Sequence, residues 1–285
     1  MKLITWNTQW CKGLDGVVSP ERIVQGARAM GDFDVLCLQE ISQNYPSLTG
    51  DTPQDQPAEI ARLLPGFEVV FGAAIDEKPH GRGVRQRFGN LIASRLPILQ
   101  IQHFALPSPA GPVQPHPWMP RQCTVCTLQA AWGPVRVMTT HLEYYSEIQR
   151  LAQVQALRQL NQALCDHAHY RPLVAPDEIN TPYQAKPHST DVVLCGDFNF
   201  EPHSEPYEAM TSPASGHPFH DAWVLANPDQ SHPPTFRLYD DTYGPDAVSC
   251  DFCFLSDSIS PRLKSISVDT VTKVSDHQPV MIELI

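Results

Sequence analysis

The sequence carries little positive charge and has no long apolar run. Its 285 residues include 20 Lys and Arg against 31 Asp and Glu, which gives a formal net charge of −11. Long nucleic acids are held by clustered basic residues, so this composition argues against a broad nucleic-acid-binding surface, but not against a local site. No apolar stretch reaches the length of about 18 residues that a membrane span needs, and no signal peptide is visible. We therefore expect a cytoplasmic protein without a membrane span.

No disulfide framework is expected, although the chain has eight cysteines. Without an export signal, these residues are predicted to be reduced thiols. Two pairs, Cys123/Cys126 and Cys250/Cys253, have the spacing of a zinc knuckle. Both pairs lie in strand-like runs, where residues three apart face opposite sides of a sheet and do not easily bind one metal ion. We interpret these four residues as small side chains of the hydrophobic core.

Linkers, internal repeats and low-complexity tracts are also absent, which favours a single domain over residues 1–285. The hydrophobic fraction of 42% is high enough for a large α/β core. Apolar runs predict strands at Lys2–Trp6, Val35–Leu38, Phe67–Phe71, Asn90–Ser94, Gln122–Leu128, Val135–Thr140, Asp191–Cys195, Asp251–Leu255 and Val280–Leu284. Helical spacing predicts helices at Glu21–Met30, Ala58–Leu63 and Glu147–His167. The apolar face of the last helix is predicted to consist of Ile148, Leu151, Val154, Leu157, Leu160 and Leu164.

Proline is abundant, with 28 residues. It concentrates in three segments, Pro107–Pro120, Arg171–Pro187 and Glu201–Pro234. We predict that these segments are long loops without regular strands or helices. Because long loops on a rigid scaffold usually carry specificity, the chemistry is expected near them.

Polar residues recur at the ends of the predicted strands. In LCGDFN, Asp197 and Asn199 follow a buried run, and they point the same way because side chains alternate along an extended chain. Similar positions are held by Asn7 after LITW, Glu40 after VLCLQ, His141 after VMTT and Asp276–His277 before the last strand. A turn or cap explains any one of them. Their accumulation favours a site for a hard cation such as Mg²⁺, which prefers oxygen ligands, with histidines available for phosphoryl oxygens or protons.

An ordered set of short motifs spans nearly the whole chain. It consists of TWN (5–7), LQE (38–40), GN with SR (89–90 and 94–95), THLE (140–143), GDFN (196–199), CDF (250–252) and SDH (275–277). This combination resembles the endonuclease/exonuclease/phosphatase superfamily, with its deoxyribonuclease-I-like fold. The resemblance implies a four-layered α/β sandwich of two mixed β-sheets flanked by helices, and metal-dependent hydrolysis of phosphate esters.

The resemblance also implies a role for each motif residue. Glu40 resembles the principal metal ligand, with Asn7 and Asp276 beside it, and the expected ion is Mg²⁺ or Mn²⁺. Asp197 resembles the residue that orients or deprotonates the attacking water, and Asn199 resembles the residue that holds the phosphate. Such a site acts mainly by positioning a water in line with the leaving group and by neutralising charge on the phosphoryl oxygens.

Two histidines and a further aspartate complete the predicted catalytic set. His277 resembles the histidine that binds a phosphoryl oxygen, and Asp251 would orient it through its other ring nitrogen. His141 resembles a histidine that contacts the phosphate or assists the leaving group in the deoxyribonuclease-like and sphingomyelinase-like branches. This chain departs from the usual pattern at Cys250, where many relatives carry a basic or small residue.

Substrate-binding residues are predicted in the loops. Arg87 and Asn90 belong to the Gly-rich segment HGRGVRQRFGN, in which Arg82, Arg85 and Arg87 form either a phosphate-facing arm or part of a solvated loop. A group of aromatic residues either stacks on a base or packs the loops, and it consists of Tyr144, Tyr145, Phe236, Tyr239 and Tyr243.

We therefore expect a divalent-metal-dependent hydrolase of phosphate esters, specifically a phosphodiesterase or nuclease that uses in-line attack by an activated water. The alternatives are a phosphomonoesterase or lipid phosphodiesterase of the same fold, or a non-catalytic binding protein. The expected partner is a phosphate-ester substrate, with nucleic acid among the options. The expected oligomeric state is a monomer.

Overall fold

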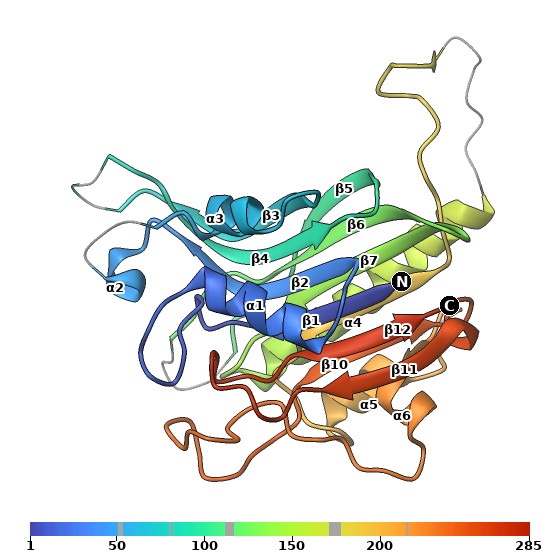
Figure 1. Cartoon of the computed structure of the whole chain (residues 1–285). Coiled ribbons are helices and arrows are strands. Elements are labelled where there is room, and N and C mark those ends of the chain that lie inside the picture. The colour runs from blue at the N-terminus through green and yellow to red at the C-terminus, as the bar shows by residue number, and fades with distance from the viewer. Residues whose placement is uncertain (51–53, 80, 82, 112–116, 171–177, 215) are drawn as a thin grey trace.

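Two β-sheets form the centre of the molecule (Figure 1). The computed structural model describes residues 1–50, 54–79, 81, 83–111, 117–170, 178–214 and 216–285. Within these residues, the first sheet has the strand order β11 (Leu263–Val268), β12 (Val280–Leu284), β1 (Lys2–Asn7), β2 (Val35–Gln43), β4 (Gln86–Ser94), β3 (Glu68–Glu77). The second sheet has the order β5 (Ile98–Ala105), β6 (Gln122–Ala130), β7 (Gly133–His141), β8 (Val192–Asp197), β10 (Asp251–Ser256), β9 (Phe219–Asp221).

Each sheet is mixed, because it contains one parallel pair of neighbouring strands. The strands β1 and β2 run parallel in the first sheet, and β7 and β8 run parallel in the second. The two pairs face each other across the interface between the sheets. This topology brings the ends of four buried strands toward one region of the molecule.

Helices cover the outer face of each sheet, so the molecule has four layers (Figure 1). The helices α1 (Pro20–Met30) and α3 (Gln56–Leu63) pack on the first sheet, whereas α4 (Glu147–His169) and α5 (Glu205–Thr211) pack on the second. One hydrophobic core lies between the sheets and one under each helical layer. The connections carry α2 (Pro46–Thr49), α6 (Ala222–Ala226) and the 3₁₀ helix η2 (Ser260–Arg262). The predicted four-layered sandwich is confirmed.

The central strands are apolar on both faces because each lies between two cores. In β2, Cys37 packs in the core between the sheets, while Leu36 and Leu38 pack in the core under α1 and α3. The pair Cys123/Cys126 follows the same rule, with one residue in the core under α4 and the other in the core between the sheets. All eight cysteines are free and buried. The interpretation of Cys123 and Cys126 as core residues is confirmed.

The helix α4 matches its predicted range closely, but its predicted apolar face is partly wrong. Ile148 is 46% exposed, whereas Gln149 and Gln153 are buried. The side chain of Gln153 accepts a hydrogen bond from the backbone N–H of Glu143 (2.9 Å) and donates one to the carbonyl oxygen of Pro107 (3.2 Å). The side chain of Gln153 is therefore buried because it binds the backbone of neighbouring loops.

The loop prediction for Glu201–Pro234 is wrong, because this segment contains α5, β9 and α6. Proline does not prevent the first of these helices, since Pro206 occupies its first turn, where no backbone donor is needed. The edge strand β5 was also missed. Its half-buried side carries Gln100 and Gln102, so the apolar residues do not form the alternation that indicates a core-facing strand.

Parts of Pro107–Pro120 and Arg171–Pro187, together with Arg82, lie outside the described residues. In the part of the chain that the structure describes, no helix has both the length and the apolar composition needed to cross a membrane. The single-domain organisation over residues 1–285 stays a prediction.

Gly196 shapes the end of β8, one residue before Asp197. Its φ is +142°, and a Cβ at this position would collide with the carbonyl oxygen of Thr140 on β7. We predict that Gly196→Ala lowers the free energy of unfolding by about 3 kcal/mol, because backbone strain and the collision add. Urea denaturation measures this loss.

The matched control is Gly133→Ala. Gly133 also has a left-handed φ of +131°, but an added Cβ there meets nothing within 4 Å. This variant is expected to cost only about 1 kcal/mol. Equal losses for the two variants would contradict a role for the close approach of β8 to β7.

Candidate active site

Three neighbouring strands of the second sheet place catalytic candidates side by side. Asp197 is the last residue of β8, and in the sheet register it lies opposite His141 at the end of β7 and Asp251 at the start of β10. His141 and Asp251 therefore flank Asp197 on both sides. The apolar runs of all three strands end at this edge of the sheet, and polar side chains follow them there.

The first sheet contributes Asn7, at the end of β1, and Glu40, within β2. Glu40 has a φ of +61° and lies where the pairing of β2 with β4 shifts register between Leu38 and Ile41. An irregularity of this kind redirects a side chain locally. It turns the Glu40 carboxyl group out of the strand pattern and toward the end of β1, where it accepts a hydrogen bond from Nδ2 of Asn7 at 3.2 Å.

The SDH segment is tied to β1 by two hydrogen bonds. Oγ of Ser275 donates to the carbonyl oxygen of Asn7 at 2.8 Å. Nε1 of Trp6 donates to the carbonyl oxygen of His277 at 2.9 Å. Residues more than 260 positions apart in the sequence are thus held together, and the side chains of Asp276 and His277 line the same cavity as Glu40 of the first sheet.

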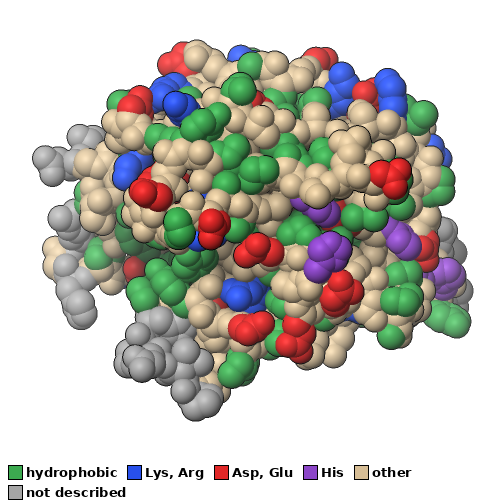
Figure 2. Space-filling view, turned by 90° about the horizontal axis from the view of Figure 1, so that it is seen from below, with side chains coloured by type: hydrophobic (Ala, Val, Ile, Leu, Met, Phe, Trp, Pro, Cys, Tyr) green, Lys and Arg blue, Asp and Glu red, His purple; other side chains and the backbone are tan. Residues whose placement is uncertain are grey.

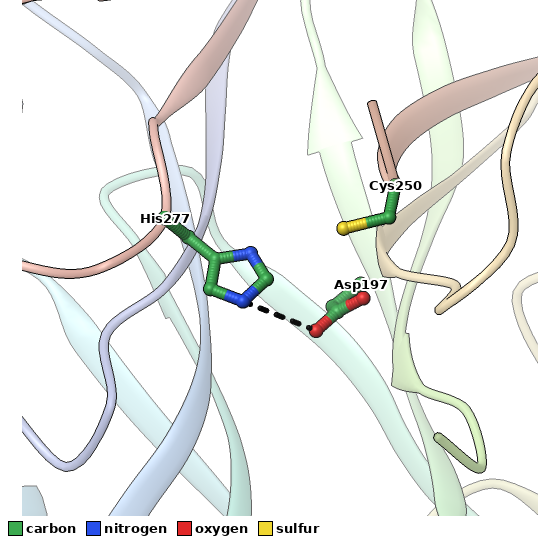
Figure 3. A group of neighbouring side chains, drawn as sticks. All are labelled: Asp197, Cys250 and His277. Atoms are coloured by element: carbon green, nitrogen blue, oxygen red, sulfur yellow. Dashed lines mark ion pairs between the residues drawn. The ribbon is translucent and has the colours of Figure 1, made fainter. Parts of the chain in front are cut away.

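Asp197 is the centre of the site (Figure 3). It is 1% exposed, and its Oδ2 accepts a hydrogen bond from Nδ2 of Asn7 at 2.8 Å. The Nε2 atoms of His141 and His277 lie 3.5 and 3.7 Å from the same oxygen. Its Oδ1 accepts from the backbone N–H of Asn199 at 2.9 Å. Burial alone would raise the pKa of Asp197, but the two histidines and these donors outweigh it and lower the pKa.

His277 is oriented by Asp251. Nδ1 of His277 donates to Oδ2 of Asp251 at 2.8 Å, which leaves Nε2 facing Asp197. Burial disfavours the charged ring, but the carboxylates of Asp251 and Asp197 overcome that effect and raise the pKa of His277 to about 10. The ring therefore carries a positive charge near neutral pH and presents an N–H group to the site.

Cys250 completes this buried group (Figure 3). Its thiol donates to Oδ2 of Asp251 across 3.6 Å, and ligating atoms of Asp197, Cys250 and His277 all lie within 4.8 Å of one another. Burial raises the pKa of the thiol well above its usual range. Cys250 is therefore a protonated donor that supports the carboxylate next to His277.

His141 differs from His277 in charge. Burial, and then the positive charge of Arg121, lower the pKa of His141 to about 3. The ring is consequently neutral at physiological pH. His141 also lies near two carboxylates, Asp197 at 3.5 Å and Glu40 at 3.9 Å, but the charge of Arg121 opposes its protonation, whereas His277 is hydrogen-bonded to Asp251.

Glu40 and Asp276 are two carboxyl groups that line the same part of the site. Burial, and then the charge of Asp276, raise the pKa of Glu40 to about 7, and burial raises the pKa of Asp276. Oδ1 of Asn7 is already engaged, because it accepts from the backbone N–H of Gln9 at 3.1 Å. Two carboxyl groups that disfavour each other's charge, one buried at Asp276 and one half-buried at Glu40, are a donor set that a divalent cation would stabilise.

Arg121 is a site residue that the sequence analysis missed. It is 6% exposed, and its Nε donates to Oε2 of Glu143 at 3.4 Å. Its Nη1 is buried and has no hydrogen-bond partner among the described residues. Arg121 directly precedes β6 and belongs to none of the family motifs, so neither the polar residues noted at strand ends nor the resemblance identified it.

A cleft of about 170 Å³ is lined by the polar residues Glu40, Arg121, His141, Asp197, Asn199, Asp276 and His277. Its walls combine the polar groups with aromatic rings, which are Trp10, Tyr144, Tyr145, Phe236 and Tyr243. The structure brings together all of the predicted catalytic and metal-binding residues, namely Asn7, Glu40, His141, Asp197, Asn199, Asp251, Asp276 and His277. Their individual roles stay predictions.

The predicted substrate-binding residues have different positions. Tyr144 lines the cleft, and Asn90 lines a smaller cavity that also contacts Glu40. Arg87 is not brought to the cleft. Arg87 lies on β4, and its guanidinium group pairs with the carboxylate of Asp76 on β3, at 3.3 Å, and donates to the side chain of Gln43 on β2, at 3.3 Å. The structure therefore does not support the phosphate-facing arm at this residue.

Comparison with known proteins decides the family. The sequence model of the Endonuclease/Exonuclease/phosphatase family matches residues 4–277. The chain belongs to this family. No curated protein matches the sequence significantly.

Solved structures of the endonuclease/exonuclease/phosphatase family share the fold of this chain. A family member from Beutenbergia cavernae is 22% identical, with 99% of this chain and 70% of that chain covered and a TM-score of 0.66. A mannosyl-6-phosphatase from Bacteroides thetaiotaomicron is 18% identical, with 100% and 99% covered and a TM-score of 0.67. A 3′ phosphatase from Neisseria, bound to a product DNA hairpin, is 19% identical, with 100% and 99% covered and a TM-score of 0.62.

The charge of His277 provides a direct test of the site's electrostatics. We predict that Asp251→Asn lowers the pKa of His277 by roughly one unit or more, because the variant keeps the shape of the side chain and removes the negative charge. A pH titration of the ring signals by NMR measures the change. The control is Asp257→Asn, since Asp257 pairs with His220 at the surface. An unchanged His277 pKa in Asp251→Asn would contradict the assignment of the charge to this carboxylate.

Proposed function

We propose that this family member is a divalent-metal-dependent phosphodiesterase, in which a water molecule attacks phosphorus in line with the leaving group. The observation that carries the proposal is the environment of Asp197. This buried carboxylate faces one charged and one neutral histidine. The carboxylate can orient a water while the histidines bind a phosphoryl group beside it. The proposal includes a monomeric, cytoplasmic protein.

Glu40 and Asp276 are the residues that would hold the cation. The raised pKa of Glu40, caused by burial and by Asp276, supports this assignment, because a bound cation removes the repulsion between the two carboxyl groups. In the arrangement described above, Asn7 orients the Glu40 and Asp197 carboxylates through its NH₂ group. When bound, a divalent cation supplies positive charge to phosphoryl oxygens.

Asp197 orients the attacking water. Because its pKa is lowered, the carboxylate is a weak base, so it accepts the water's proton only as the bond to phosphorus forms. Its hydrogen bonds to Asn7 and to the backbone of Asn199 fix both of its oxygens, so the water is held in one direction. Orientation is thus its principal contribution.

His277 stabilises the charge that develops on phosphorus. Its ring is charged, is held by Asp251, and directs Nε2 toward the cleft, which suits donation to a phosphoryl oxygen. Arg121 adds a second positive group, because its Nη1 is buried without a partner among the described residues. His141 is neutral and provides one hydrogen bond to the phosphate or to the leaving group.

A diester is favoured over a monoester because a second cavity adjoins the cleft. This cavity of about 210 Å³ shares Tyr144, Asn199 and Phe236 with it, so groups on both sides of a phosphate find room. Phosphatase activity is the second candidate, because two of the structural neighbours are named as phosphatases. On the face shown in Figure 2, basic side chains are interspersed with acidic and apolar ones. The net charge of −11 favours a compact substrate over a long duplex.

Asp197→Asn tests the reaction. With Mg²⁺ present, we predict that this variant lowers kcat for bis(4-nitrophenyl) phosphate by about 10² to 10³, because it removes the group that orients the water. Parallel assays with 4-nitrophenyl phosphate distinguish diesterase from monoesterase activity. Asp191→Asn, just before the same strand, is the control and keeps wild-type kcat. A wild-type protein inactive on both compounds, or an Asp197→Asn variant of full activity, would sink the proposal.

Glu40→Gln tests the metal assignment without measuring activity. We predict that this variant binds Mn²⁺ about 10- to 100-fold more weakly than the wild type, because one carboxylate ligand is lost. Electron spin resonance of free Mn²⁺ measures the binding. Glu68→Gln, at the start of β3, is the control with an exposed carboxyl group and leaves the affinity unchanged. Equal Mn²⁺ affinities for Glu40→Gln and wild type would remove Glu40 from the metal site.

A further inference from the structure

A second cavity lies beside the catalytic cleft. Its volume is about 210 Å³, and it shares Tyr144, Asn199 and Phe236 with the cleft. Two arginines, Arg150 and Arg237, line this second cavity but do not line the cleft. A substrate that fills the cleft therefore has a positively charged compartment next to its phosphate.

The loop around Arg237 is built to hold a guanidinium group in one place. Arg237 has a φ of +61°, which is unfavourable for a residue other than glycine. Gly244 has a φ of +135°, which would strain any other residue, and a Cβ there would displace Nη1 of Arg237 from its place. Nη1 also donates to the carbonyl oxygen of Tyr243 at 2.8 Å. Strain of this kind persists where the surrounding structure fixes it, and it concentrates at functional sites.

Aromatic stacking links Arg237 to the catalytic histidine. The guanidinium carbon of Arg237 lies 5.5 Å from the centre of the Phe236 ring. The Phe236 ring stacks on His277, with ring centres 4.3 Å apart and an interplanar angle of 19°. The position of Arg237 is therefore fixed relative to the group that contacts the scissile phosphate.

Both arginines have donors to spare. Nη1 of Arg150 donates to the carbonyl oxygens of Glu143, at 2.7 Å, and Tyr144, at 2.9 Å, which anchors the side chain. The Nε atoms of Arg150 and Arg237 are buried and have no hydrogen-bond partner among the described residues. A buried unpaired donor is costly, and a small shift of each side chain toward an anion in the cavity would remove this cost.

The acidic residues of the cavity do not satisfy these donors. Glu147 and Glu201 also line it, but both are exposed, so their carboxylates remain hydrated at its rim. The rest of the lining includes Ser204 and the aromatic ring of Phe200. A negatively charged oxygen group attached to a compact organic unit matches this combination of guanidinium groups, a hydroxyl group and rings.

We propose that Arg237 and Arg150 form an anion subsite that binds a second phosphate of the substrate, carried on the unit next to the scissile phosphate. This inference rests on the proposed function, because it assigns the substrate class of the same site. The preferred substrates are then phosphate esters with two phosphates, such as a short oligonucleotide or a nucleoside bisphosphate ester. Arg237 determines specificity, and Asn199 and Phe236 separate the two phosphates.

Equilibrium binding tests the subsite independently of catalysis. The probes are thymidine 3′,5′-bisphosphate and thymidine 5′-monophosphate, measured by calorimetry with chelator so that neither is hydrolysed. We expect the bisphosphate to bind about tenfold more tightly, the effect of one charge-assisted hydrogen-bonded pair. The net charge of −11 would by itself weaken binding of the more highly charged compound, so non-specific electrostatics cannot produce this preference. Equal or weaker binding of the bisphosphate to the wild type overturns the inference.

Arg237→Gln is expected to reduce the tenfold preference to about one. Arg237→Lys keeps the charge without the planar group and is expected to give an intermediate ratio, so it decides the case if the first variant does not fold. Arg262→Gln is the control. The guanidinium carbon of Arg262 also lies over an aromatic ring, 4.8 Å from the centre of Trp132, but Arg262 lines neither cavity. A preference that survives in both Arg237 variants overturns the assignment.

Kinetics separates this inference from the proposed function. The substrates are thymidine 5′-(4-nitrophenyl phosphate) and the same ester with a 3′-phosphate, assayed with Mg²⁺. The ratio of their kcat/KM values is expected to be about ten in the wild type and about one in Arg237→Gln. Hydrolysis of both esters with a ratio of one overturns the subsite and keeps the phosphodiesterase. Failure to hydrolyse either ester, together with the binding preference, overturns the phosphodiesterase and keeps the subsite.

Discussion

The site depends on one requirement, which is that Asp197 keeps a negative charge while it is buried. An isolated buried carboxylate is unfavourable by several kcal/mol, so it needs donors on all of its oxygens. This chain provides them from separate segments, through Asn7 of the first sheet and the backbone of Asn199, and the charged ring of His277 lies 3.7 Å from the same carboxylate. Because these donors come from both sheets, the hydrogen bonds to this one carboxylate help to fix how the two sheets pack against each other. The stability of the fold and the geometry of the site are coupled at this residue.

Charge is distributed unevenly around that carboxylate. His277 is held in its charged form by Asp251 and Asp197, and His141 is held neutral by burial and by Arg121. Identical side chains thus acquire different roles from the groups that each ring contacts. Such an arrangement is fixed before a substrate arrives, so the reaction requires little rearrangement of the surrounding dipoles. The cost is a concentration of buried charge that a purely structural core would avoid.

The sequence predicts the central strands and the motif residues well, and the physical reason is local. Buried strands between two cores are continuous apolar runs, and a polar residue such as Asp197 or His141 at the end of a run marks the edge of the core. The ordered motifs also predicted that residues distant in sequence, such as Asn7 and Asp276, belong to one site, but features outside the motifs that depend on distant contacts were not predicted. Arg121 reaches the site only because β6 lies beside β7, and Arg237 reaches it because Phe236 pairs with His277 in an isolated bridge. Nothing in the residues around Arg237 reports this pairing.

The pairing of β1 with β12 has a consequence for the order in which the protein is assembled. The strands β1 (Lys2–Asn7) and β12 (Val280–Leu284) lie side by side in the first sheet, yet 272 residues separate the end of one from the start of the other. While the ribosome makes the intervening segments, the N-terminal strand has an open hydrogen-bonding edge, which favours association with other chains. The same late strand follows Asp276 and His277, so the last residues of the candidate site arrive with the closure of the sheet. A nascent chain therefore lacks part of this site, and keeps an open strand edge, until nearly all of this sequence has been synthesised.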